Sequence, residues 1–70
     1  MTPYRIAENY INGNLTEAKE GAKRITQSAL RLSLIMEMGY NPEAATAIAA
    51  FLKGRGTFQD ACDAEAKVIH

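Results

Sequence analysis

The segment 32–45 constrains the fold more than any other part of this sequence. An apolar helical pattern stops at Gly39, and the dipeptide Asn41-Pro42 then supplies an N-cap followed by a proline at the first helical position. A second stop follows at Gly54-Arg55-Gly56, after which Thr57 predicts a further N-cap. These signals predict short helices joined by tight turns.

The first helix is predicted to begin at Thr2-Pro3, where the threonine caps and the proline occupies the first turn. Ile6 and Tyr10, with Ile11 beside them, form its apolar face. Asn12-Gly13-Asn14 ends this helix, because asparagine and glycine tolerate a left-handed backbone and favour turns.

A second helix follows, with Asn14 as N-cap and Glu17 as the acidic residue of a capping box. On its exposed side we expect Glu20 to pair with Arg24, one turn further on. Its buried face is predicted from residues at helical spacing: Leu15, Ala18, Ala22 and Ile25.

The pattern leaves open whether this helix runs on to Met38 or breaks near Thr26, and we favour the break because Gly21 weakens the long version. The stretch 29–38 is apolar around almost all of its circumference, with Ser33 and Glu37 as its polar strip. A helix of this kind is central, or a partner covers its second side.

Arg31 projects from that helix on the side opposite the polar strip, among Leu34, Ile35 and Met38. An unpaired buried arginine costs several kcal/mol, so the head group either stays in water at the rim or pairs with a carboxylate of a second copy. We predict a symmetric homodimer, which would also add the buried area that a 70-residue chain lacks.

The helix after Pro42 is rich in alanine and is expected to pack on two sides, with Lys53 in its last turn and Gly54 as C-cap. The last helix follows Thr57. Its predicted inner face consists of Phe58, Cys62, Ala66 and Ile69.

Seventy residues make a single domain, 1–70, near the lower size limit for a core without disulfides or metal. The prediction is an all-α fold, a compact bundle of four or five short helices. The lone Cys62 fits a reducing compartment, the N-terminus lacks a signal-peptide pattern, and no apolar stretch is long enough to span a membrane. We therefore expect a cytoplasmic protein with no membrane partner.

The side chains offer little catalytic chemistry. Cys62 has only the terminal His70 as a base, and Asp60 and Asp63 fall on the outer face of the last helix. The segment 54–57 lacks the lysine of a phosphate-binding loop. We therefore predict that the protein is not an enzyme and that it uses no cofactor and no metal.

Two resemblances extend these predictions. Met38-Gly39-Tyr40, followed by the segments 41–45 and 58–62, resembles the ubiquitin-associated (UBA) domains, in which a Met-Gly-aromatic loop joins the first two of three helices. The likeness covers about residues 30–69. It implies a UBA-like arrangement of the last three helices, with a protein-binding patch formed by the loop and the last helix.

The segment 6–14, followed by a basic helix with Lys19, Lys23 and Arg24, resembles small accessory proteins of bacteriophages and mobile elements. This likeness covers about residues 5–26 and names no activity. It implies a bacterial or phage source, where ubiquitin is absent, so that a UBA-like domain would bind another protein in the host cell cytoplasm.

Eight basic and eight acidic side chains give a net charge of zero, which removes the bulk attraction that most nucleic-acid binders use. The predicted function is therefore a non-enzymatic protein-binding factor that docks on a host protein and modulates or inhibits it. Its predicted binding residues are Met38, Gly39, Tyr40, Lys23, Arg24 and Arg31.

A small helical DNA-binding regulator is the alternative. Helices flanking Gly39 or the segment 54–56 resemble a helix-turn-helix pair, with Lys53 and Arg55 near phosphates. The acidic last helix makes a poor groove-reading surface, however, so nucleic acid ranks behind protein as the expected partner.

Overall fold

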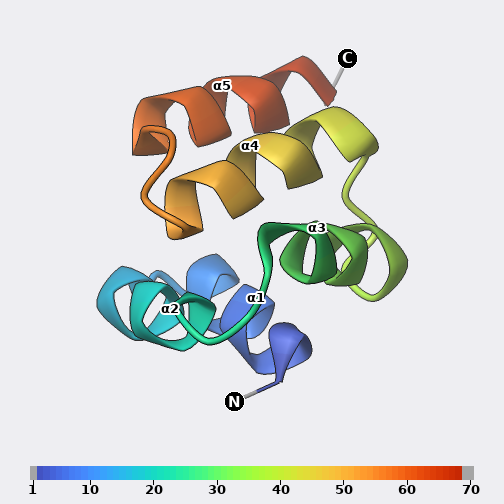
Figure 1. The fold of residues 1–70 in the computed structure, drawn as a ribbon. Helices are drawn as coiled ribbons and strands as arrows, with labels where there is room; N and C mark the ends of the chain where they lie inside the picture. Colours follow the sequence, from blue (N-terminus) through green and yellow to red (C-terminus); the bar gives the residue numbers. More distant parts are fainter. Residues whose placement is uncertain (1, 69–70) are drawn as a thin grey trace.

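The computed structural model describes residues 2–68 of the chain. Within this range it contains five α-helices and no strand: α1 (Pro3–Ile11), α2 (Leu15–Ala22), α3 (Gln27–Met36), α4 (Pro42–Leu52) and α5 (Phe58–Val68). Figure 1 shows α4 in the middle of the bundle, with α5 on one side and α1, α2 and α3 on the other. The predicted all-α bundle of short helices is confirmed.

Most helices begin where a capping side chain was predicted. Side-chain oxygens accept a hydrogen bond from the backbone N–H three residues later, at 3.3, 3.1, 2.7 and 3.0 Å, for Thr2, Thr26, Asn41 and Thr57. Asn14 precedes α2 as predicted, but its side chain makes no capping bond. Its ψ of 66° departs from the extended backbone, with ψ of 158° and 162°, that aims the oxygens of Thr2 and Asn41 at their helices.

The predicted break near Thr26 is present, because α2 ends at Ala22 and α3 begins after Thr26. Arg24 therefore lies outside the helix, and the predicted pair with Glu20 does not form. Glu20 instead pairs with Lys23, whose Nζ lies 3.1 Å from Glu20 Oε1.

The turn between α3 and α4 depends on Gly39. Helix α3 ends at Met36, earlier than the sequence pattern indicated, and Gly39 then adopts a φ of +76°. The backbone N–H of Tyr40 donates to the carbonyl of Leu34 at 3.0 Å and closes the turn. A Cβ at position 39 would meet no atom within 4 Å, so the need for glycine comes from the left-handed backbone alone.

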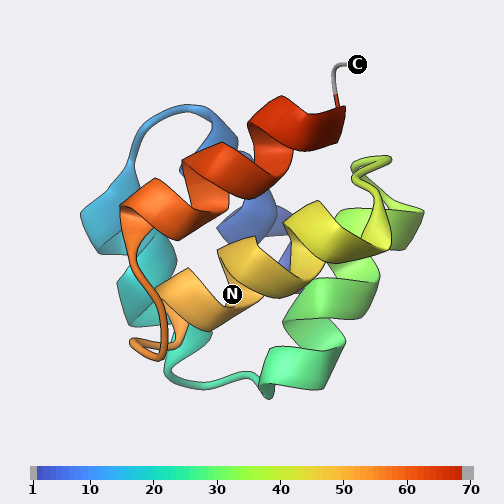
Figure 2. The ribbon, with the colours of Figure 1, turned by 90° about the horizontal axis from the view of Figure 1, so that it is seen from above.

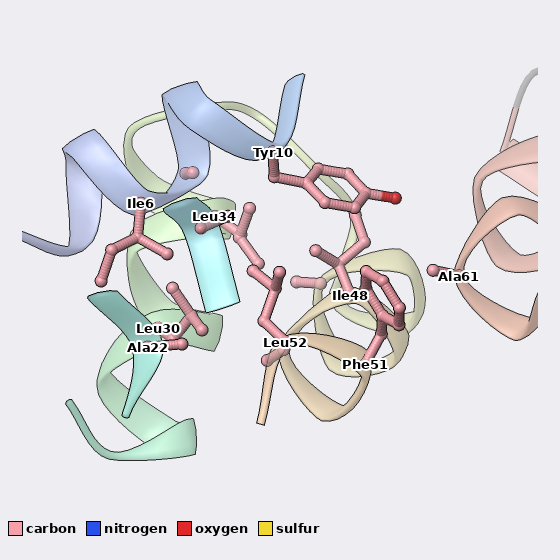
Figure 3. Packing of buried hydrophobic residues seen from close by; sticks show 13 residues of the cluster. Ile6, Tyr10, Ala22, Leu30, Leu34, Ile48, Phe51, Leu52 and Ala61 are labelled. Atoms are coloured by element: carbon pink, nitrogen blue, oxygen red, sulfur yellow. The ribbon is translucent and has the colours of Figure 1, made fainter. Parts of the chain in front are cut away.

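The hydrophobic core lies between α4 and the helices on either side of it (Figure 3). Its largest fully buried side chains come from three helices: Ile6, Leu30, Leu34 and Ile48. Burying an aliphatic side chain of this size contributes about 1.5–3 kcal/mol. Alanines fill much of the remaining core, which lets the short helices approach closely.

The two residues of the polar strip differ in exposure. Ser33 is buried and its hydroxyl donates to Glu37 Oε2 at 3.2 Å, whereas Glu37, which follows the end of α3, is exposed. Two apolar side chains of α3 also face solvent, Leu32 and Met36, with exposures of 57% and 74%. Arg31 is half-buried at the edge, where its Nε donates to Thr46 Oγ1 at 2.8 Å.

The predicted inner face of α5 is also partly wrong. The buried residues are Ala61 and Ala64, whereas Phe58 is 46% exposed, Ala66 is exposed and Cys62 is half-buried. Ile69, the last member of that predicted face, lies outside the described residues. The reason is that α5 rests on the alanine-rich helix α4 through small side chains, as Ala61 does in Figure 3.

Candidate functional site

The loop Met38-Gly39-Tyr40 lies at the surface with its two large side chains turned inward. Met38 and Tyr40 are half-buried and pack against the hydrophobic core, and only Gly39 is exposed. A partner can therefore reach Gly39 and only the exposed parts of Met38 and Tyr40 in this loop.

Tyr40 forms one wall of a groove of about 360 Å³. We call this hollow the aromatic groove. It is lined by residues from α1, the α1–α2 turn, the start of α2, the α3–α4 loop and α5: Tyr10, Ile11, Gly13, Leu15, Tyr40, Phe58, Cys62 and Glu65. Ile11 is 51% exposed and stands at its edge. Most of the surface of the groove is thus apolar or aromatic.

Ring contacts fix the inner wall of the aromatic groove. The rings of Tyr10 and Phe58 meet edge-on with centroids 6.4 Å apart, and Phe51 lies beneath them at 6.3 and 5.3 Å. The Tyr10 hydroxyl donates to Glu65 Oε1 at 2.8 Å, which joins α1 to α5. This wall is therefore held in place by both packing and a hydrogen bond.

Burial raises the pKa of the Tyr10 phenol well above its ordinary value of 10.0, and the hydrogen bond to the Glu65 carboxylate raises it further. Burial and the negative charge of Glu65 also raise the pKa of Tyr40. Both tyrosines therefore stay neutral at physiological pH, so the groove presents hydroxyl groups and one carboxylate rather than phenolates.

A second feature lies at the other end of α2. The turn between α2 and α3 and the turn between α4 and α5 meet at one edge of the molecule (Figure 2). They enclose a hollow of about 350 Å³, which adjoins a smaller one of about 180 Å³. Together the two hollows are lined by five cationic side chains, which we call the basic surface: Lys19, Lys23, Arg24, Lys53 and Arg55.

Hydrogen bonds hold two of these cations. Lys53 Nζ donates to the backbone carbonyls of Ala22 and Ile25, at 2.8 Å each, and so satisfies carbonyls at the end of α2 and in the turn before α3. Arg55 Nη1 donates to Gln27 Oε1 at 2.7 Å. Lys19 lies over the ring of Phe51, with its Nζ 4.5 Å from the ring centroid.

A further hollow, of about 660 Å³, runs between α4 and α5 over a floor of alanines. Its rim carries three carboxylates, those of Glu43, Asp60 and Asp63, and it meets the basic surface at Arg55. Lys67 forms an ion pair across this hollow, with its Nζ 3.5 Å from Glu43 Oε1. The charges of this hollow are mixed and partly paired, so it offers no coherent chemistry for one ligand.

The six predicted binding residues separate into three places. Lys23 and Arg24 belong to the basic surface, and the loop residues Met38, Gly39 and Tyr40 lie together, with Tyr40 alone of the three lining the aromatic groove. Arg31 joins neither, because it bonds to Thr46. The predicted protein-binding residues did not include four that line these features: Lys53 and Arg55 in the basic surface, and Ile11 and Phe58 in the aromatic groove. Helical periodicity assigned Phe58 and Ile11 to the core, and no sequence signal marks their partial exposure.

Cys62 is half-buried in the aromatic groove, and its only candidate base, His70, lies outside the described residues. Among residues 2–68 no three metal-ligating side chains gather. Over the same range, each helix is too short or too polar to cross a bilayer. Comparison of the chain with protein-family models, curated proteins and solved structures gave no match.

Proposed function

We propose that this chain is a small non-enzymatic protein-binding factor whose aromatic groove receives an apolar side chain of its partner. The observation that carries this proposal is the composition of the groove. Two tyrosines, a phenylalanine and three further apolar side chains from separate parts of the chain line one hollow that is open to solvent. Exposed apolar clusters rimmed by polar groups are typical of protein-interaction sites.

The groove suits a partner side chain because its walls are firm and its edge is open. Tyr10 is held by Glu65 and by two rings, so little side-chain entropy is lost when a partner packs against it. Ile11 and Phe58, both about half exposed, would lose the most water on contact. In many interfaces a few side chains that become buried on binding, aromatic ones among them, carry most of the affinity.

The UBA-like arrangement belongs to the same proposal. Its support is the order of α3, α4 and α5, the left-handed Gly39 in the joining loop, and the presence of Tyr40 and Phe58 in one groove. The resemblance of the N-terminal segment to phage-encoded accessory proteins supports a partner in the bacterial host cytoplasm. Docking there would modulate or inhibit that protein.

Capture from a bacterial lysate with two matched variants tests the proposal. Ile11 and Tyr4 are both exposed on α1, but only Ile11 lines the aromatic groove. We expect the tagged wild type and Tyr4→Gln to enrich the same protein, as read by quantitative mass spectrometry, and Ile11→Gln to lose it. Equal capture by both variants, or no specific capture by the wild type, would contradict the proposal. Urea midpoints of the three proteins serve as the folding control.

A further inference from the structure

The basic surface concentrates charge that the net charge of the chain conceals. Five of the eight lysines and arginines line its two hollows, although the whole chain is neutral. They come from α2, from the α2–α3 turn and from the residues that follow α4, so folding brings them together from two distant segments (Figure 2). Like charges repel when they are gathered in this way, and an arriving anion relieves that repulsion.

Few counter-ions inside the molecule oppose this charge. Lys23 pairs with Glu20, which is the one ion pair that the structure shows for these five cations within residues 2–68. Lys19 rests on the face of Phe51, and Arg24 projects into solvent from the turn. Most of the positive charge is therefore available to an external anion.

Two of the cations are already ordered before any ligand binds. Lys53 uses two of its three N–H donors on backbone carbonyls, which leaves one donor and the full charge for a ligand. Arg55 spends one of its five donors on Gln27 and keeps the remainder. The entropy cost of placing these long side chains is thus met by the fold itself.

We propose that the basic surface binds an acidic segment of the partner protein. A long nucleic acid fits less well, because the surface is bounded at Arg55 by the hollow that carries Glu43, Asp60 and Asp63. A uniform polyanion that extended past Arg55 would meet these carboxylates, whereas a short run of aspartate or glutamate side chains would not.

The basic surface lies next to the aromatic groove, with the buried ring of Phe51 between them. Lys19 covers the ring of Phe51, and the centroid of that ring lies 5.3 Å from that of Phe58, which lines the groove. One partner segment that combines acidic and apolar side chains can therefore engage both. In this respect the acidic partner rests on the protein-binding function proposed above and names its chemistry.

A titration of ¹⁵N-labelled protein with hexaglutamate, followed by amide chemical shifts at low ionic strength, tests the basic surface alone. The probe carries no apolar side chain, so it leaves the aromatic groove out of the measurement. We expect saturable shifts confined to residues 19–27 and 52–55. The affinity should fall as salt is added.

Two double variants with the same change in net charge supply the comparison. Lys23→Glu with Arg24→Glu alters the basic surface and removes one surface ion pair. Arg5→Glu with Lys67→Glu alters exposed cations elsewhere and removes two. We expect the first to weaken hexaglutamate binding by about tenfold or more and the second to change it by less than about threefold.

Three results would overturn the acidic-partner assignment. These are the absence of saturable shifts in the wild type, an equal loss in both double variants, and tighter binding of a short DNA duplex than of hexaglutamate at the same salt. Failure of the groove proposal looks different, since Ile11→Gln would then capture the partner normally while hexaglutamate still bound. The two hypotheses are therefore tested separately.

Discussion

Lys53 follows the end of α4, but it stabilises a different part of the fold. Its ammonium group reaches the carbonyls of Ala22 and Ile25 and so supports the break between α2 and α3. Substitution Lys53→Met keeps the length and the apolar stem of the side chain but removes both hydrogen bonds. We expect this variant to fold, because the core residues are untouched, and to be measurably less stable.

The size of the loss follows from the two contacts. A hydrogen bond to a charged group contributes about 1.5–3 kcal/mol net, and the lower end applies because Lys53 is only half-buried. The Ala22 carbonyl also accepts from the Ile25 N–H at 3.2 Å, so mainly the Ile25 carbonyl is left to water. We therefore expect a loss of about 2 kcal/mol, or a fall in Tm of about 8–16 °C for a domain of this size.

Urea unfolding followed by circular dichroism measures this loss. The control is Lys67→Met, which removes only the exposed ion pair with Glu43 and should cost less than about 0.5 kcal/mol. Equal midpoints for the two variants, with equal slopes, would show that the Lys53 hydrogen bonds do not support the break and would refute the reasoning.

Three further predictions follow from single features. Gly39→Val should cost at least about 1 kcal/mol, because a β-branched residue is strained at a φ of +76°, and Gly39→Asn should cost less; unchanged urea midpoints for Val would contradict this. The raised pKa of Tyr10 means that the folded state holds the phenol proton more tightly than the unfolded chain does. The free energy of unfolding should therefore keep this contribution below pH 10.0 and lose it as the pH rises above that value. Tyr10→Phe should flatten this fall relative to wild type, and identical pH profiles would contradict the prediction. The homodimer predicted from the sequence should form through the exposed Leu32 and Met36, so sedimentation equilibrium at about 50 μM should show association that Leu32→Gln weakens; a monomer mass throughout would contradict it.

Helix boundaries could be predicted from the sequence because they depend on local chemistry. Thr2-Pro3 and Asn41-Pro42 combine a capping oxygen with a preset φ, and both begin helices as predicted. Gly39 and Gly54 stop helices for an equally local reason, since both adopt a positive φ. Such signals act within one or two turns and need no knowledge of the rest of the fold.

Faces and contacts could not be predicted in the same way, because they depend on which helices become neighbours. The pattern of α5 allowed either Phe58 and Cys62 or the alanines to face inward, and packing on α4 selected Ala61 and Ala64. The same limit applies to Arg31, because periodicity could not show that its Nε donates to Thr46 on the neighbouring helix α4. Periodicity identifies an amphipathic helix but does not say how wide its buried stripe is.

The basic surface shows most clearly why the candidate binding features could not be found without the fold. The sequence indicates a basic helix with Lys23 and Arg24, but Lys53 and Arg55 are far from it along the chain, and nothing in the sequence shows that they lie beside it. The two segments meet because the lysine that closes α2 comes from the end of α4, so the contact that stabilises the α2–α3 break also gathers the charge. Lys53 therefore contributes both to the stability of the break and to the surface for which we propose binding. For this reason the binding tests alter Lys23 and Arg24, which project from the turn, and leave Lys53 in place as part of the scaffold.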